Sequence, residues 1–329
     1  MKTPILIIMF TRSSTLKRVF EQVRLAKPER LFLYQDGPRE TNYEKDLEGI
    51  KKCREIVSNV DWECSVTTWY QSENIGCDPG SFYAYKWFFE QVEQGIILED
   101  DVVPSHSFFT YCEELLDKYS HNDRIYRICG VNHEGISKVK TSYFFSRKGA
   151  TGSWASWKRV ANMWDPSYSF LDNPGTIASL KEKFESEDYF SSWIQTAFTH
   201  REAGVPYYET ILYENKIINN MLDIIPARNL VTNIGLTEDA VHTKNYNIMP
   251  RAMKKCFNAK RYDLEFPLEH PDDITENYHY TDYVNKIMGW GHPLLRRYRK
   301  WETRVKRLLF GDKVERRLLI EKLFTSRGD

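Results

Sequence analysis

Long apolar runs are missing from this sequence of 329 residues. Its first apolar stretch, Ile5–Phe10, has six residues, whereas a membrane-spanning helix needs about 20 and a signal-peptide core about 7 to 15. CxxC pairs are also missing, and the six cysteines are scattered along the chain. In a long chain without a secretion signal, such cysteines are typical of reduced, mostly buried thiols. These absences predict a cytoplasmic protein without a spanning helix.

A net charge of either sign is missing as well, because 46 Lys and Arg balance 46 Asp and Glu. No global field steers the chain toward nucleic acid, so we expect no nucleic-acid partner. The motifs GxGxxG, GxxxxGKS/T, HExxH and GxSxG do not occur. A bound nucleotide would therefore have to be held by strand ends and a metal rather than by a glycine-rich loop.

Strand and helix patterns alternate in the first half of the chain. Apolar runs typical of buried parallel strands are separated by helical patterns, such as the stripe Leu16, Val19, Phe20 and Val23. Repeated units of this kind predict a doubly wound α/β sheet. The predicted strands are Pro4–Phe10, Arg30–Gln35, Cys64–Tyr70, Gly95–Leu98 and Arg124–Val131.

Three adjacent carboxylates, Glu99, Asp100 and Asp101, follow the predicted strand Gly95–Leu98. In open α/β sheets, ligands bind outside the carboxyl ends of the strands. Neighbouring carboxylates repel one another unless a cation lies among them, and Mg²⁺ or Mn²⁺ binds carboxylates together with substrate phosphates. The triplet therefore indicates a metal that bridges the protein to a diphosphate. The alternative is a solvated acidic turn before the next helix.

The chain resembles metal-dependent glycosyltransferases of the GT-A fold that use nucleotide sugars, in particular bacterial relatives of N-acetylglucosaminyltransferase I. Four strings carry the resemblance, which covers roughly residues 1–245: Pro4–Arg12, Leu33–Gly37, Glu73–Pro104 with the acidic triplet, and Pro226–Thr243. It implies a Rossmann-like, mixed and mostly parallel sheet flanked by helices. It also implies a catalytic domain over 1–250 and a helical C-terminal extension over 251–329.

The resemblance also implies roles for single residues. Asp101 would ligate Mn²⁺ or Mg²⁺, while Glu99 and Asp100 would contact the ribose or metal-bound water. Asp36 would accept a hydrogen bond from the nucleobase, and Arg12 would approach the nucleotide phosphates. Two simpler interpretations remain open: Asp36 as the former of an Asx turn, and Arg12 as a surface residue near a helix start.

A catalytic base is the next requirement, because an inverting transferase needs a carboxylate that takes the proton of the acceptor hydroxyl. The resemblance places an acid seventeen residues before Pro226, which is Glu209. Glu187 and Asp188 are the alternatives. His242 is the predicted second metal ligand, and the simpler interpretation is a packed or solvated histidine.

Small residues surround two tryptophans in the segment Gly149–Trp157. Such a segment is typical of a loop that folds over a bound substrate. Trp154 and Trp157 would then stack on the donor or acceptor sugar or shape the acceptor pocket, and the alternative is that both indoles fill the core.

The last stretch, Arg296–Asp329, holds twelve Lys or Arg against five Asp or Glu, interleaved with leucines. It predicts a basic amphipathic helix that contacts an anionic membrane at the inner face of the cell membrane. The alternative is a helix that packs its apolar face on the domain.

The sequence as a whole favours a glycosyltransferase that moves a sugar from a nucleoside-diphosphate sugar to a hydroxyl of a glycan or lipid-linked glycan, as in surface polysaccharide assembly. One alternative is a sugar-1-phosphate nucleotidyltransferase, but that class normally has a glycine-rich stretch after its first strand, and Phe10–Thr15 contains no glycine. Another is a non-catalytic protein that binds carbohydrate or membrane, suggested by the aromatic content of 14% and the basic tail.

Overall fold

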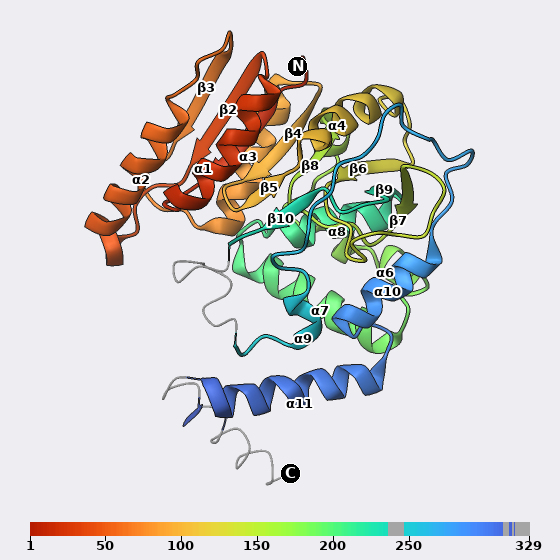
Figure 1. Ribbon diagram of the computed structural model, residues 1–329. Helices are drawn as coiled ribbons and strands as arrows, with labels where there is room; N and C mark the ends of the chain where they lie inside the picture. Colours follow the sequence, from red (N-terminus) through yellow and green to blue (C-terminus); the bar gives the residue numbers. More distant parts are fainter. Residues whose placement is uncertain (236–246, 312–315, 318, 320–329) are drawn as a thin grey trace.

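A mixed sheet of eight strands forms the centre of the computed structural model, which describes residues 1–235, 247–311, 316–317 and 319 (Figure 1). The strand order is β3-β2-β1-β4-β8-β6-β9-β7. Strands β3, β2, β1 and β4 run parallel, β8 is antiparallel to both of its neighbours, β9 is parallel to β6, and β7 is antiparallel to β9. The strands are β1 (Ile5–Met9), β2 (Arg30–Gln35), β3 (Ser65–Tyr70), β4 (Gln94–Glu99), β6 (Ile125–Cys129), β7 (Tyr143–Ser146), β8 (Trp154–Trp157) and β9 (Leu222–Pro226).

Helices flank this sheet in two groups. Helix α1 contacts α2 and α4, while α3 contacts α5 and α8. The predicted α/β class, with a mixed and mostly parallel sheet flanked by helices, is therefore confirmed. The helices are α1 (Ser13–Ala26), α2 (Tyr43–Val57), α3 (Cys77–Gln91), α4 (His106–Lys118), α5 (Lys158–Ala161), α6 (Pro174–Lys181), α7 (Glu187–Ala203), α8 (Tyr208–Ile218), α9 (Arg251–Lys254), α10 (Tyr278–Met288) and α11 (Pro293–Phe310).

The apolar runs account for the strands. Each of the five predicted strands agrees with an observed strand to within two residues at either end. Helix α1 buries its predicted stripe, because Leu16, Val19, Phe20 and Val23 all lie in the core. Its other face is charged and exposed, as expected for a helix that packs on a sheet by one side. Among the cysteines, Cys53, Cys112 and Cys129 are buried, Cys77 is exposed, and all six are free thiols.

The C-terminal segment crosses the sheet edge and ends in a long helix. Tyr280 of α10 packs on Phe144 of β7 with ring centroids 5.0 Å apart. Helix α11 lies apart from the sheet at the far end of the molecule (Figure 1). It confirms a helical C-terminal extension, while the domain boundary at residue 250 stays a prediction. Within the described residues, no helix has the length and apolar content that crossing a membrane requires.

Candidate functional site

The acidic triplet lies at the edge of the sheet where β1, β2 and β4 end. Glu99 is the last residue of β4, and Asp100 and Asp101 form the turn that leads into the short strand β5 (Val102–Pro104). A cavity of about 580 Å³, here called the first cavity, opens at this edge. It is lined by all three acids, by Arg12 after β1 and by Asp36 after β2. The fold therefore brings together five predicted site residues from three separate parts of the chain.

Arg12 is held by two of these acids. Its Nη1 donates to Asp101 Oδ2 at 2.5 Å, and its Nη2 donates to Asp100 Oδ1. Burial lowers the pKa of Arg12, but the attraction of the two carboxylates is larger and raises that pKa well above its ordinary value. Arg12 thus supplies part of the positive charge beside the acidic triplet, which the sequence led us to expect from a metal ion alone.

The triplet still carries more negative charge than Arg12 compensates. Burial raises the pKa of Asp100 to about 6, against the opposing effect of Arg12. Burial, with the nearby Asp101 and Glu209, raises the pKa of Glu99 to about 8. Crowded carboxylates with raised pKa values favour a bound cation, because a cation stabilises their charged forms.

One carboxylate oxygen of Asp101 has no partner among the residues that the structure describes. Its Oδ1 is buried and makes no hydrogen bond within the described part of the chain. Its backbone oxygen accepts a hydrogen bond from Ile234 N at 2.8 Å, just after β10 (Val231–Asn233), which pairs antiparallel with β5. A Cβ atom on the next residue, Gly235, would lie 1.9 Å from Asp101 Oδ2, so this close approach needs glycine. The paired strands β5 and β10 therefore fix Asp101 at the wall of the first cavity.

The Asp36 carboxylate already accepts four hydrogen bonds within the protein, three of them from residues 74–76. Its Oδ1 accepts hydrogen bonds from Gly37 N at 2.9 Å and Ile75 N at 3.0 Å, and its Oδ2 accepts from Asn74 Nδ2 at 2.9 Å and Gly76 N at 3.1 Å. A carboxylate has about four acceptor positions, so a nucleobase would have to displace one of these donors. The Asx-turn interpretation does not describe this geometry, because Pro38, two residues after Asp36, has no N–H to donate, and three of the four donors belong to residues 74–76. Asp36 holds Gly76 in its left-handed conformation (φ +92°) at the start of α3.

Glu209 lies in the first turn of α8, directly after the buried Tyr208. The Tyr208 ring packs on Tyr85 of α3 with centroids 5.6 Å apart, which fixes the start of the helix. Glu209 lines the first cavity and also a second cavity of about 530 Å³. Thr151 is the other residue that lines both. The two cavities therefore adjoin, and a carboxylate lies at their junction.

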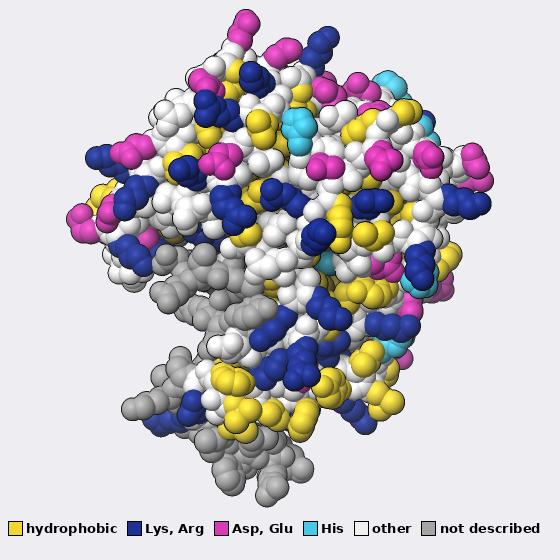
Figure 2. Space-filling view, viewed as in Figure 1, with side chains coloured by type: hydrophobic (Ala, Val, Ile, Leu, Met, Phe, Trp, Pro, Cys, Tyr) yellow, Lys and Arg dark blue, Asp and Glu magenta, His cyan; other side chains and the backbone are white. Residues whose placement is uncertain are grey.

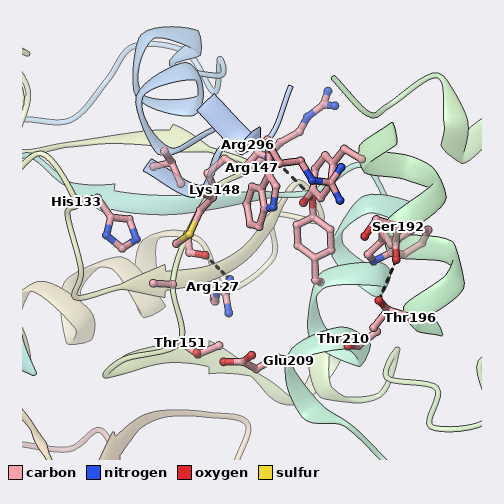
Figure 3. Close-up of a pocket in the computed structure, with 18 residues that line it drawn as sticks. Arg127, His133, Arg147, Lys148, Thr151, Ser192, Thr196, Glu209, Thr210 and Arg296 are labelled. Atoms are coloured by element: carbon pink, nitrogen blue, oxygen red, sulfur yellow. Dashed lines mark hydrogen bonds between the residues drawn. The ribbon is translucent and has the colours of Figure 1, made fainter. Parts of the chain in front are cut away.

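The second cavity is rich in cations and aromatic rings that the sequence did not single out. Figure 3 shows Thr151 and Glu209 at one end, Arg147, Lys148 and Arg296 toward the other, and Arg127 between them. The four cations come from β6, the loop after β7, and α11. They are far apart in the chain, so no local sequence signal could have found them. Its aromatic lining residues are Tyr189, Trp193, Tyr213 and Trp290.

The prediction that Trp154 and Trp157 stack on a sugar from a mobile loop is corrected by the fold. Both residues belong to strand β8 and are buried in the core. Trp154 packs on Tyr85, with ring centroids 5.3 Å apart, and Trp157 Nε1 donates to Leu116 O at 3.0 Å. Neither indole is among the residues that line the two cavities. The small-residue pattern also fits this arrangement, because glycines and serines permit a central strand to pack closely against its neighbours.

The remaining predicted residues lie elsewhere. Glu187 and Asp188 are exposed in the first turn of α7, where Glu187 pairs with Lys181 at 2.5 Å, and neither lines a described cavity. Glu209 is therefore the one of the three candidate bases that the fold brings to the site. His242 lies outside the described residues.

Comparisons with known proteins give distant similarities. No protein-family model and no curated protein matches the chain. Among solved structures, the inositol-1-phosphate CTP transferase from T. maritima is 13% identical over 71% of this chain and 89% of that chain, with a TM-score of 0.35. The 4-diphosphocytidyl-2C-methyl-D-erythritol synthase from Anaerococcus prevotii is 12% identical over 49% of this chain and 74% of that one, with a TM-score of 0.30.

A UDP-glucose pyrophosphorylase in complex with UDP-glucose is also 12% identical, over 50% of this chain and 79% of that one, with a TM-score of 0.30. Similarity this distant says nothing about the ligand or the reaction of this chain. The resemblance to glycosyltransferases stays a prediction.

Proposed function

We propose that this chain is a transferase that moves a sugar from a nucleoside-diphosphate sugar in the first cavity to a hydroxyl of an acceptor in the second. The observation that supports this most strongly is the position of Glu209 at the junction of the two cavities. A transfer between two substrates needs two adjoining sites and, for a hydroxyl nucleophile, a base where they meet. Glu209 would meet that need.

In the proposed reaction, Glu209 accepts the proton of the acceptor hydroxyl while the hydroxyl oxygen forms a bond to the anomeric carbon. The bond between that carbon and the diphosphate oxygen breaks, and its electron pair leaves with the nucleoside diphosphate. Arg12 lines the first cavity beside the acidic triplet. It would stay in this position and contact the departing diphosphate. Attack from the side of the second cavity would invert the anomeric configuration.

A divalent cation fits the residues of the first cavity in a limited way. Asp101 Oδ1 is a buried oxygen that lacks a hydrogen-bond partner in the described chain. No group of three His, Cys, Asp or Glu side chains in that part of the chain is arranged to hold a metal. The protein would therefore supply Asp101, with Glu99 beside it, and phosphates and water would complete the shell, as is usual for Mg²⁺. Such a cation would neutralise charge on the leaving diphosphate.

Nucleotidyl transfer is the second candidate function. The cations of the second cavity favour it, because a sugar phosphate would suit them. In that reaction the phosphate itself attacks the nucleotide, so it would have to lie at the junction beside Glu209, where like charges repel. The glycosyl transfer places a neutral hydroxyl there instead.

A thermal-shift panel separates these functions. UDP-, GDP-, dTDP- and CMP-sugars are added with and without Mn²⁺, because a ligand that binds the folded state raises the melting temperature. The proposal predicts a metal-dependent rise with a UDP-, GDP- or dTDP-sugar, and release of the nucleoside diphosphate from that donor on turnover. Pyrophosphate release from a nucleoside triphosphate would instead establish nucleotidyl transfer. No binding of any nucleotide with Mn²⁺ would favour a non-catalytic carbohydrate-binding protein.

We also propose that α11 contacts an anionic membrane. Leu294, Trp301 and Leu309 are 79%, 59% and 63% exposed and fall on one helical stripe. Lys300, Arg304 and Arg307 lie on one side of that stripe and are exposed as well. Figure 2 shows apolar and basic side chains gathered along this helix. The adjoining side of the helix is tied to the protein through the buried Glu302, which accepts a hydrogen bond from Arg251 N at 3.0 Å.

Vesicle flotation tests the membrane contact. The proposal predicts that the chain floats with vesicles containing phosphatidylglycerol but not with pure phosphatidylcholine, and that a triple serine variant at Leu294, Trp301 and Leu309 stays in solution. Leu25→Ser on α1, at a residue 61% exposed, is the matched control and should float like the parent. Equal binding to both vesicle types would refute the electrostatic part of the proposal.

A further inference from the structure

The second cavity contains buried hydrogen-bond donors that have no acceptor among the described residues. Arg127 is 4% exposed and Trp193 is 8% exposed, and both line this cavity. Arg127 Nε and Nη2 are bound to Asp223 and Gly149, but Arg127 Nη1 has no hydrogen-bond partner in the described chain. The same holds for Trp193 Nε1. Buried donors without partners cost free energy, so the cavity suits a ligand that is rich in acceptors.

The charges of the cavity are also incompletely matched. Arg147 Nε pairs with Glu276 at 3.0 Å, and Lys148 Nζ pairs with Glu185 at 3.0 Å. Arg296, from the first turn of α11, is half-buried and makes no ion pair or side-chain hydrogen bond with a described residue. Glu276 and Glu185 are occupied by these ion pairs. A further acid, Glu209, lies at the opposite end of the cavity (Figure 3).

Asp223 adds to this excess of positive charge, because it is shared. Its Oδ1 accepts from Arg127 at 3.0 Å, and its Oδ2 is bound by Lys216. One carboxylate therefore compensates two cations. This leaves the middle of the cavity with an excess of positive charge, and Arg296, without an ion pair to a described residue, adds positive charge at the end away from Glu209. A charged group of opposite sign is what such an end would bind most strongly.

The walls of the cavity suit a sugar ring. Tyr189 and Trp290 stack on each other with centroids 4.8 Å apart and an interplanar angle of 11°. Lys148 Nζ lies 4.9 Å from the Trp290 centroid and 5.1 Å from that of Tyr189, so the rings also hold this cation in place. The volume of about 530 Å³ is within the range of small-molecule sites, roughly 300 to 1,000 Å³.

We propose that the second cavity binds an acceptor carbohydrate that carries an oxyanion, either a phosphate or a carboxylate. The oxyanion lies near Arg296 and Lys148, the reactive hydroxyl lies at the other end, beside Glu209, and Arg127 lies between them, where its Nη1 can donate to the sugar. This inference rests on the proposed function, since it assigns the acceptor of that reaction. In this arrangement the oxyanion of the acceptor lies away from Glu209. The neutral hydroxyl can then approach the base without repulsion between like charges.

Binding of small sugars to the full chain tests the assignment. The probes are glucose 1-phosphate, glucuronate and uncharged glucose, titrated separately by calorimetry in the presence of saturating nucleoside diphosphate and Mn²⁺. The nucleoside diphosphate fills the first cavity, so the sugars report on the second. We expect binding of glucose 1-phosphate, glucuronate or both, weakened by added salt, and no binding of glucose at the same concentrations. The first two arms distinguish a phosphate from a carboxylate.

Two variants on the same helix localise the effect. Arg296→Gln should weaken binding of the charged sugar by about fivefold or more, because a charge-assisted contact is lost. Arg297→Gln removes the same charge from the neighbouring exposed residue, which does not line the cavity, and should leave the affinity within twofold. Both variants should bind the nucleoside diphosphate as the parent does, since Arg296 does not line the first cavity.

The outcomes separate this proposal from the proposed function. Equal binding of charged and uncharged sugars, no binding of any sugar, or an unchanged affinity in Arg296→Gln would overturn the anionic acceptor while nucleotide binding stands. A chain that binds no nucleoside diphosphate with Mn²⁺ would instead remove the proposed function itself, and that is measured before any sugar is added.

Discussion

Arg12 Nη1 donates to Asp101 Oδ2 at 2.5 Å, so the arginine occupies one oxygen of that carboxylate, while Oδ1 has no hydrogen-bond partner in the described chain. Arg12 also binds Asp100 through its other terminal nitrogen. One guanidinium thus ties the end of β1 to the end of β4. This arrangement gives Arg12 a structural role at the site in addition to any contact with a ligand.

Replacing Arg12 by glutamine should destabilise the protein. The Asp100 side chain is 3% exposed and the Asp101 side chain 11%, and removing one partner of a largely buried ion pair costs about 2 to 4 kcal/mol. Mn²⁺ should recover more stability in this variant than in the parent, because the cation replaces lost positive charge. Denaturant unfolding with and without Mn²⁺ measures both effects.

Arg24→Gln is the control, because Arg24 forms an ion pair with Asp61 at a surface where both side chains are more than half exposed. It should leave the free energy of unfolding unchanged within error. If Arg12→Gln were equally harmless, the guanidinium would not be the group that holds the two acids together.

Asp101→Asn should weaken metal-dependent nucleotide binding by about tenfold or more, which corresponds to about 1.4 kcal/mol. The amide keeps the shape of the side chain but loses the charge that a hard cation requires. The variant should remain folded, since Asp100 still pairs with Arg12. Calorimetric titration of a nucleoside diphosphate with Mn²⁺ gives the affinity, and Asp61→Asn serves as the surface control. Parent-like affinity in Asp101→Asn would remove this residue from the cation site.

His133 predicts a dependence of stability on pH. Burial lowers the pKa of His133 from 6.5 to about 4. Between these values the unfolded chain binds more protons than the folded one, so the free energy of unfolding falls as the pH drops through this window. We expect His133 to account for roughly 3 kcal/mol of that fall. Unfolding curves from pH 7 to pH 4 measure it.

His133→Gln should flatten the dependence, because glutamine does not titrate. His121→Gln, at an exposed histidine, should retain the slope of the parent. An unchanged slope in His133→Gln would mean that the imidazole is protonated in the folded state within this range.

Five strands were predictable because a buried parallel strand needs a continuous apolar run. Short apolar segments such as Pro4–Phe10 and Arg30–Gln35 fit few other structures. The meeting of Arg12, Asp36 and the acidic triplet was predictable for a related reason, since the carboxyl ends of parallel strands share one edge. Local sequence therefore indicated five of the eight strands and the five charged residues that meet in the first cavity.

Other features depend on tertiary contacts that no local pattern records. Trp154 lies among small residues that suit either a loop or a tightly packed strand, and pairing of β8 with β4 and β6 decides between them. The hydrogen bonds of Asp36 come from residues 74–76, nearly forty positions later. Arg127, Lys148 and Arg296 become neighbours through the order of the strands and the return of α11.

The most direct measurement concerns Glu209→Gln, with the donor that stabilises the protein in the nucleotide-sugar panel and the acceptor class that the charged sugars define. Glutamine preserves the wall between the cavities but cannot take a proton. The account predicts that nucleoside diphosphate affinity with Mn²⁺ stays within twofold while the rate of sugar transfer falls by about 100-fold or more. A variant that transfers sugar at the rate of the parent would contradict the account, because the two cavities would then meet at a residue that takes no part in the reaction.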